Sequence, residues 1–401
     1  MTVTIASDTA AASSDEPTIS RALTFLLATA CGLIAANLYY GQPLAGPIGL
    51  ELGLSPAATG LIVTLTQIGY GAGLLLIVPL GDLLENRRLI LTMIALATVA
   101  LLAAAFSSQP ILFLAASLAI GLGSVAVQVI VPFAASMAPP AHRGRVVGNV
   151  MSGLMVGIML ARPVASVVAA ASSWHVMYFL SAAVMVLLAI VLSLTLPRRV
   201  PHTQLGYGAL IASMGQLIVT QPILRRRALY QACQFAAFSL FWTVTPLLLA
   251  GPEFGLTQSG IALFALAGVA GAIASPIAGS LADRGLSRPA TVLGIVSVIA
   301  AFLITHIGGY GSTLALGLLV AAAILLDFGV TTSMVVGQRA IYGLGAEQRS
   351  RLNGIFMATF FAGGAIGSAV GAWAFAEGGW LLASSIGIAL PLAALAYFAT
   401  E

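Results

Sequence analysis

Two charged side chains lie where the sequence is otherwise apolar. Asp327 falls inside an apolar run that begins near Ser312, and Arg162 precedes Pro163 in another. A buried charge in hydrocarbon is unfavourable unless it is paired, hydrated or neutralised. Hydrocarbon favours the neutral carboxyl group, so we expect Asp327 to bind and release a proton. Arg162 keeps its charge at physiological pH and is a candidate to bind an anionic group.

Each of these two residues also has a structural alternative. Asp327 could accept hydrogen bonds from Thr331 and Thr332, one helical turn away, and Arg162 could simply hold helices together. At about 1.5 Å per residue, Asp327 lies in the inner half of its span and Arg162 in the outer half of its own. We therefore expect two separate sites.

The amino-acid composition indicates that most of the protein's surface faces lipid and not water. The chain is 60% hydrophobic and 7% charged, whereas soluble domains carry roughly 25% charged residues. This composition predicts an integral membrane protein. The net charge of +4 comes from arginines near the predicted span ends, so no nucleic-acid partner is expected.

The sequence offers no catalytic or metal-binding constellation. The four histidines lie at span ends or in loops, without the close His/Glu spacing of a metal-binding helix, and no glycine-rich phosphate loop precedes a lysine. We expect neither an enzyme nor a bound metal or cofactor. The histidines are His142, His175, His202 and His306.

Apolar runs long enough to cross the hydrocarbon core as helices occur twelve times. Helices are expected because an open sheet cannot satisfy its backbone hydrogen bonds in lipid. The predicted spans are 21–42, 57–80, 88–106, 110–137, 145–170, 174–196, 228–250, 258–281, 289–306, 312–336, 349–374 and 379–400.

The basic residues predict the orientation. All 16 are arginines, and every one except Arg162 lies at the start of the first span or in alternate loops. The positive-inside bias assigns those loops to the cytoplasm, together with both termini. We therefore predict a multi-pass protein of the bacterial inner membrane.

One long connection divides the chain. We predict a disordered cytoplasmic tail at 1–20, a six-helix bundle at 21–196, a cytoplasmic linker at 197–227 and a second six-helix bundle at 228–401. Within the linker, an apolar stripe precedes three arginines and predicts an interfacial helix, although a plain solvated linker is the alternative. The stripe consists of Leu210, Met214, Leu217 and Ile218.

Two loop patterns repeat six spans apart. The segment that begins at Gly81 corresponds to the one at Gly279, and Arg143-Gly144-Arg145 corresponds to Arg349-Ser350-Arg351. An even separation makes the two halves parallel repeats, which predicts a cavity between them near the membrane midplane.

With these repeats, the chain resembles the major facilitator superfamily, and within it the twelve-span proton-coupled drug and metabolite exporters. The pattern that carries the resemblance is the loop motif Gly-x-x-x-Asp-Arg-x-Gly-Arg-Arg. Its first copy supplies Gly81, Asp82, Glu85, Arg87 and Arg88, and its second supplies Gly279, Asp283, Arg284 and Arg288. The resemblance implies an all-α fold of 12 transmembrane helices in two parallel repeats.

The loop motif has a physical reason to act as a gate. Its acid can lie against the N-terminal end of a helix from the other half, and its arginines can pair with acids, when the cytoplasmic gate is closed. The alternative is that these arginines only anchor the topology.

The resemblance also implies which helices line the cavity. The first, fourth, seventh and tenth spans surround the centre, and the second span adds to them. Each polar residue could instead bond a neighbouring helix. The candidate substrate-binding residues are Asn37, Tyr39, Tyr40, Gln42, Gln67, Tyr70, Gln128, Arg162, Gln231, Gln234 and Trp242.

Taken together, these features predict a secondary active transporter. We expect a monomer that exports a small amphipathic drug or metabolite in exchange for protons, with Asp327 as the proton site. The alternative is a proton-coupled importer or a facilitator of a small polar or anionic solute, such as a sugar, an amino acid or an organic acid. The expected partners are this small molecule, protons and the lipid bilayer.

Overall fold

The computed structural model describes residues 19–139, 142–201, 206–270, 277, 280, 284–309, 311–345 and 348–401. Every regular element in those ranges is a helix. Ten helical stretches there are long and apolar enough to cross a membrane. The longest, α15 (Arg349–Phe398), contains two helices, because Gly378 and Gly379 depart from helical geometry. The predicted all-helical membrane fold is thus confirmed.

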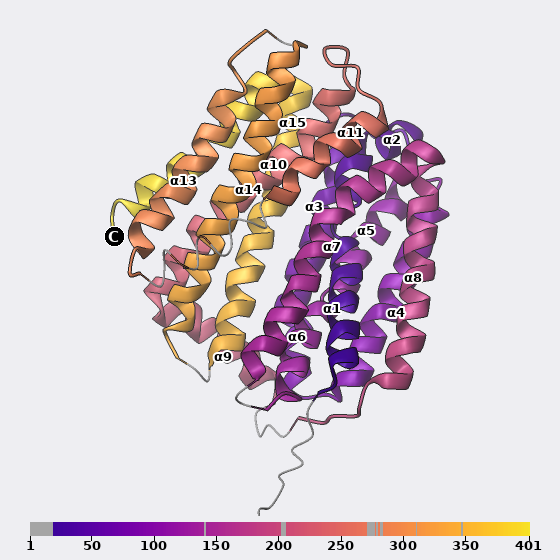
Figure 1. The fold of residues 1–401 in the computed structure, drawn as a ribbon, viewed down its shortest axis with the longest axis vertical. Helices are drawn as coiled ribbons and strands as arrows, with labels where there is room; N and C mark the ends of the chain where they lie inside the picture. The colour runs from indigo at the N-terminus through magenta and orange to yellow at the C-terminus, as the bar shows by residue number, and fades with distance from the viewer. Residues whose placement is uncertain are drawn as a thin grey trace, which may run out of the picture.

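The helices gather in two groups that lie side by side (Figure 1). The first group, called here the first half, comprises α1 (Arg21–Ala36), α2 (Gly41–Glu51), η1 (Ala58–Gly60), α3 (Leu61–Leu76), η2 (Val78–Asp82), α4 (Asn86–Ala105), α5 (Pro110–Ser124), α6 (Ala126–Ser136), α7 (Arg143–Ala171) and α8 (Trp174–Thr195). The second half comprises α10 (Pro222–Ala250), α11 (Gln258–Ala265), η3 (Leu266–Ala270), α13 (Ser287–Ile304), α14 (Thr313–Tyr342) and α15. That each half is a separate six-helix bundle stays our interpretation.

A proline interrupts the first span at the residues that matter for the site. Pro43 has no N–H to bond the carbonyl of Tyr39 four residues earlier, and its ring crowds that carbonyl. The chain therefore leaves the helix between α1 and α2, and the Gln42 N–H bonds the Tyr39 carbonyl instead, at 3.3 Å. This turn places Tyr39 and Gln42 side by side in the middle of a long span.

Glycines allow neighbouring helices to touch along their backbones. A methyl group at Gly153 of α7 would lie 2.3 Å from the carbonyl oxygen of Ala28 on α1. One at Gly367 of α15 would lie 2.0 Å from the carbonyl oxygen of Ala236 on α10. Small residues permit this close approach in membrane bundles, where dispersion contacts hold helices together.

The two halves meet mainly through α3 and α15. The hydroxyl groups of Thr64 and Ser368 lie 2.8 Å apart across this contact. A methyl group at Gly60 would lie 2.5 Å from the Ser368 carbonyl oxygen, so the backbones also approach closely here. In a second contact between the halves, α7 of the first half packs against α11 of the second.

The connection between the halves contains a helix, α9 (Tyr207–Thr220). Three of the four residues of its apolar stripe, Leu210, Met214 and Leu217, are buried, in contact with α10 and α15, whereas Ile218 is exposed. The Tyr207 hydroxyl donates to the Leu76 carbonyl at the end of α3, at 2.8 Å. The stripe therefore packs on protein, and α9 touches both halves.

We predict that Gly153→Val destabilises the protein by about 1–3 kcal/mol, because the added side chain must displace the α1 backbone. The control is Gly148→Val on the same helix, where a methyl group would meet nothing within 4 Å. Thermal unfolding of the detergent-purified variants measures the difference. Equal unfolding temperatures for the two variants would contradict the close packing of α1 on α7.

Candidate functional site

Arg162 and Asp327 contact the same tryptophan. The Trp242 indole N–H on α10 donates a hydrogen bond to Asp327 Oδ1 on α14, at 3.0 Å. The Arg162 guanidinium on α7 lies over the Trp242 ring, with its Cζ 4.4 Å from the ring centre. A cation is attracted to the electron-rich face of an indole, while the indole N–H at the edge is a donor. One side chain therefore holds a positive group on its face and an acid at its edge.

Aromatic rings and one amide complete the surroundings of Arg162. Its Cζ lies 5.1 Å from the Tyr39 ring centre and 5.2 Å from that of Phe238. Its Nε donates to Gln42 Oε1 at 2.6 Å. We call these six residues the Trp242 cluster: Tyr39, Gln42, Arg162, Phe238, Trp242 and Asp327.

The Trp242 cluster joins the two halves. Tyr39, Gln42 and Arg162 belong to the first half, and Phe238, Trp242 and Asp327 to the second. All six are buried: Arg162 is 3% exposed and Asp327 is 6% exposed. Any motion of one half against the other must change these contacts.

The expectation of two separate sites is wrong. It assumed that each helix begins at the membrane surface, but α14 has 30 residues, about 45 Å of helix for a hydrocarbon core of about 30 Å. Asp327 therefore lies near the middle of its helix, at the level of Arg162. Among the described side chains no direct ion pair joins the two, and the indole contacts both.

The threonines considered as partners of Asp327 do not take that role. Among the hydrogen bonds of the described residues, Asp327 accepts only from Trp242. The Thr332 hydroxyl is buried without a partner in the same part of the chain. The acid is thus tied to another helix and not to its own.

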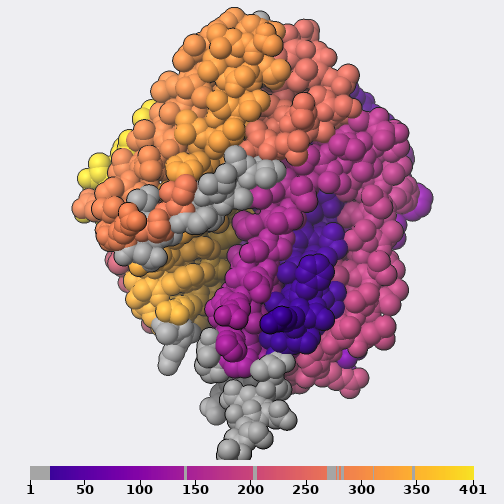
Figure 2. Space-filling view, in the orientation of Figure 1, coloured from indigo at the N-terminus to yellow at the C-terminus, as the bar shows by residue number. Residues whose placement is uncertain are grey.

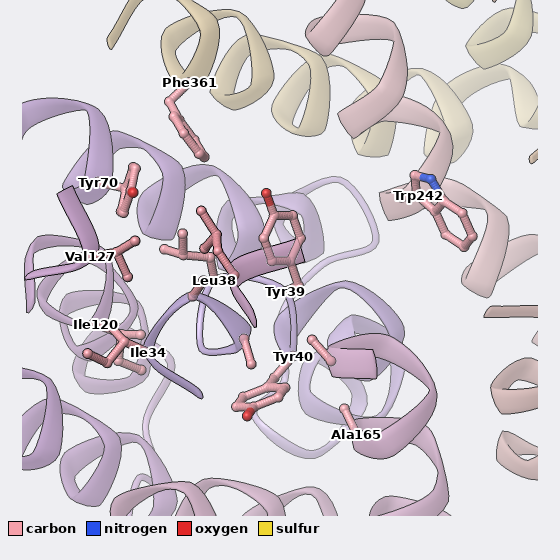
Figure 3. Packing of buried hydrophobic residues seen from close by; sticks show 14 of the residues in the cluster. Ile34, Leu38, Tyr39, Tyr40, Tyr70, Ile120, Val127, Ala165, Trp242 and Phe361 are labelled. Carbon is pink, nitrogen blue, oxygen red and sulfur yellow. The ribbon is translucent and has the colours of Figure 1, made fainter. Parts of the chain in front are cut away.

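The turn between α1 and α2 sends its side chains in different directions. Tyr39 and Tyr40 leave this turn on different sides (Figure 3). The amide of Asn37 bonds α8: its Oδ1 accepts from the Ser181 hydroxyl at 2.5 Å. Asn37 and Tyr40 therefore lie outside the Trp242 cluster.

Other predicted cavity residues bond neighbouring helices. Gln67 Nε2 donates to the Ser239 hydroxyl across the halves, at 2.9 Å. Gln128 Nε2 donates to the Tyr70 hydroxyl at 3.0 Å, within the first half. Gln231 and Gln234 donate from α10 to the Val330 carbonyl and the Ser333 hydroxyl of α14, at 3.3 and 3.2 Å. In these contacts the four glutamines hold helices together.

Two residues of the site region were not predicted. Phe238 lies four residues before Trp242 on α10, so helical spacing places both on one face and could have identified it. Gly268 leaves little room for a side chain: a methyl group there would lie 3.1 Å from Asp327 Oδ2 and 3.2 Å from the Trp242 ring. No sequence signal distinguishes this glycine from the many others.

The first copy of the loop motif is held mostly within the first half. The Asn86 side chain donates to the Gly81 carbonyl at 2.6 Å, and Arg87 donates to the Ser193 carbonyl near the end of α8. The exposed Arg88 side chain pairs with the largely covered Glu85 at 2.9 Å, and ion pairs with an exposed partner contribute little.

One acid of the motif faces the second half. Asp82 lies within electrostatic reach of Arg351 in the first turn of α15. In the second copy, the Arg284 backbone N–H donates to the Ser280 carbonyl at 3.2 Å, and the Arg288 guanidinium lies 5.7 Å from the Phe398 ring centre. Gly279 and Asp283 lie outside the described residues.

A separate groove of about 1060 Å³ lies between α1 and α7, which are neighbours on the face shown in Figure 2. Its lining is mostly apolar, and Phe25 and Val156 are exposed in it. The Trp242 cluster residues are not among its lining residues, so the groove and the cluster are distinct features of the described chain.

Comparison with known proteins agrees with this architecture. The model of the Major Facilitator Superfamily matches residues 24–340. The chain therefore belongs to the major facilitator superfamily, and it is a secondary transporter and not an enzyme.

Relatives and solved structures support this assignment. The chain is 39% identical over 362 residues to the putative uncharacterized transporter YgaY of Escherichia coli strain K12, covering 90% of this chain and 91% of that one. It is 32% identical to the probable transporter SCO4007 of Streptomyces coelicolor, covering 88% and 82%. The nucleoside transporter NupG has the same fold, with a TM-score of 0.73 at 16% identity, over 94% of this chain and 99% of that one.

We predict that Trp242→Phe destabilises the protein by about 1.5–3 kcal/mol, because phenylalanine keeps an aromatic face but removes the N–H that Asp327 accepts. The matched control is Trp373→Phe, whose parent side chain is 50% exposed on α15. Chemical denaturation in mild detergent, monitored by circular dichroism, compares the two. A Trp242→Phe protein as stable as the control would show that the indole N–H is not an important contact.

Proposed function

We propose that this chain moves a small molecule across the membrane by alternating access and that transport is coupled to a proton bound at Asp327. The observation that carries the proposal is the placement of this buried acid on Trp242, at the boundary between the halves. A carboxyl group can change its charge there, and Trp242 contacts the opposite half through Arg162.

Protonation of Asp327 changes two interactions at once. A neutral carboxyl group is a weaker acceptor for the Trp242 N–H than a carboxylate. It also no longer attracts the Arg162 charge, which interacts with Asp327 across this cluster. The loss of attraction to Arg162 weakens the hold of the second half on the first, because Arg162 and Asp327 lie in opposite halves. The weaker hydrogen bond lies within the second half and loosens the indole that contacts Arg162. A bound proton therefore favours movement of the halves.

The composition of the site suits an amphipathic cargo. The rings of Tyr39, Phe238 and Trp242 can stack on an apolar body, and Gln42 and Arg162 can bond a polar group. For such a cargo our first candidate is efflux in exchange for protons, the activity implied by the resemblance to exporters. The second is proton-coupled uptake of a small anionic solute, and the fixed positive charge of Arg162 favours it.

The loop motif supplies a gate at one end of the halves in this proposal. Attraction between Asp82 of the first half and Arg351 of the second holds that end closed, as charge pairs across an interface do. The exposed arginines of the motif, among them Arg88, serve as topology anchors.

We further propose a bacterial inner-membrane location with both termini in the cytoplasm. The C-terminal residue Glu401 pairs with Arg227 at the start of α10, at 2.9 Å, so it lies on the same face as the arginine-rich connection at 197–227. Because one chain supplies both halves of the Trp242 cluster, a monomer is sufficient for transport.

The coupling is tested by vesicle transport. A panel of compounds, compared for accumulation in cells with and without the gene, first identifies a transported one. We predict that Asp327→Asn abolishes its proton-driven uphill flux but spares exchange, because the amide cannot take up a proton. Glu253→Gln, a change at an exposed loop acid, is the control and keeps the uphill flux.

The orientation of the vesicles separates the two candidates. A proton-driven exporter loads inside-out vesicles, whereas proton-driven uptake loads right-side-out ones. Uphill flux that persists in Asp327→Asn would contradict the assignment of the proton site.

The orientation of the chain is tested by cysteine labelling, in a background that lacks Cys31 and Cys233. We predict that an impermeant thiol reagent added to intact cells labels Ser173→Cys, between α7 and α8, and does not label Arg349→Cys. Labelling of the second variant from outside would overturn the proposed topology.

A further inference from the structure

The Trp242 cluster contains buried hydrogen-bond donors without partners. Among the described residues, Arg162 Nη2 and Gln42 Nε2 have no acceptor, and the two side chains are 3% and 0% exposed. Buried donors are bonded in nearly all native structures, so an unpaired one calls for an explanation. Two occur here on adjacent groups.

The two free donors belong to side chains that bond each other. Arg162 Nε bonds Gln42 Oε1 at 2.6 Å. Nη2 shares its carbon with Nε, and Nε2 shares its carbon with Oε1. The unpaired N–H groups therefore flank a single hydrogen bond, and an oxygen-rich group could accept from both, as a carboxylate does from a guanidinium.

The charge of the site restricts the ligand. Arg162 does not give up its proton at physiological pH, and among the described residues no carboxylate pairs with it directly. A cationic ligand would be repelled, and a neutral one would leave the guanidinium without a counter-charge. An anion fits best. The three rings around Arg162 add a surface for an apolar body next to the anionic group.

We infer that the cargo carries a carboxylate or a similar anionic group bound by Arg162 and Gln42, and that it binds together with a proton on Asp327. This rests on the proposed function, because it assigns the cargo of that same site, and it selects the second candidate given there, proton-coupled uptake of an anionic solute. An anion at Arg162 lies close to the Asp327 carboxylate, and like charges repel strongly in a buried site. A proton on Asp327 removes the repulsion and frees the Arg162 charge for the cargo.

The charged and titratable groups around Asp327 agree with this direction of coupling. From α7 comes Arg162 and from the turn after α1 comes the Tyr39 hydroxyl, both of which interact electrostatically with Asp327. Trp242 from α10 and Gly268 from η3 add no titratable group. Coupling is reciprocal, so a proton that strengthens cargo binding is itself bound more strongly when cargo is present. A proton and a cargo molecule that are coupled in this way are transported in the same direction. An inward proton gradient then drives uptake of the cargo.

The test is a binding measurement that needs no transport. Full-length protein in detergent is titrated with benzoate, phenylacetate and hexanoate, with the matching amides, and with benzylamine, phenethylamine and hexylamine. Ligand-induced shifts in the unfolding temperature give the apparent affinities at about pH 6 and pH 8, where these acids remain anions. We expect at least one acid to bind with an apparent affinity roughly tenfold higher than that of its amide. The amines should not raise the unfolding temperature.

The pH dependence tests the coupling. Acid affinity in the wild type should rise towards low pH, by at most about tenfold per pH unit because one proton is involved. Asp327→Asn should keep acid binding and lose the pH dependence. Gln42→Glu places an internal carboxylate against Arg162 and should weaken acid binding at least about tenfold, whereas Arg145→Gln at the exposed start of α7 should not.

The inference is overturned if none of the acids stabilises the protein, if amides or amines do so equally well, or if the pH dependence survives in Asp327→Asn. Should the acids fail to bind while Asp327→Asn still abolishes proton-driven flux, the cargo class is wrong and the transporter proposal stands. Should the acids bind in preference to the amides and amines while Asp327→Asn changes neither the flux nor the pH dependence, the proton site falls and the anion site remains.

Discussion

The site depends on one interaction, the contact of the Arg162 guanidinium with the Trp242 ring. A guanidinium in a hydrophobic bundle needs compensation for its lost hydration, and a nearby carboxylate would provide it most directly. Here an aromatic face provides part of it, from the opposite half of the protein. The compensation is incomplete, because Nη2 keeps no partner among the described residues. The halves are therefore held together by a contact that leaves donors available for a ligand.

The edge of the same indole connects this contact to an acid. The Trp242 N–H donates to Asp327 while the face of the same ring contacts Arg162. Because a single side chain contacts both groups, a proton on Asp327 changes the electrostatics of the Arg162–Trp242 contact between the halves directly. Gly268 keeps this geometry compact, because any side chain there would press on both Asp327 and Trp242. The proposed joint binding of a proton and an anion needs three parts, and the cluster contains them. They are the permanent positive charge of Arg162, the titratable carboxyl group of Asp327 and the aromatic rings around Arg162. Elsewhere the halves approach closely where α15 meets α3 and the preceding η1 through small residues such as Gly60, and in the proposed mechanism this contact permits their movement.

Sequence reasoning identified the fold because hydrocarbon leaves few choices: apolar runs must be helices, and arginines must lie at their ends. It also selected five of the six residues of the Trp242 cluster by their polar or aromatic character. It could not tell them from Asn37 or Gln231, which are equally polar but bond a neighbouring helix. Depth along a helix was misleading, because α14 is much longer than the membrane is thick.

The contact between Arg162 and Trp242 can be measured directly by a double-mutant cycle. The unfolding free energies of the wild type, Arg162→Gln, Trp242→Leu and the double variant give the coupling between the two side chains, whatever each change costs by itself. The structure predicts a favourable coupling of about 1–2 kcal/mol, the range of a desolvated cation over an indole. Additive effects, with no coupling beyond error, would show that the guanidinium does not rest on the indole and would remove this contact from those that join the halves.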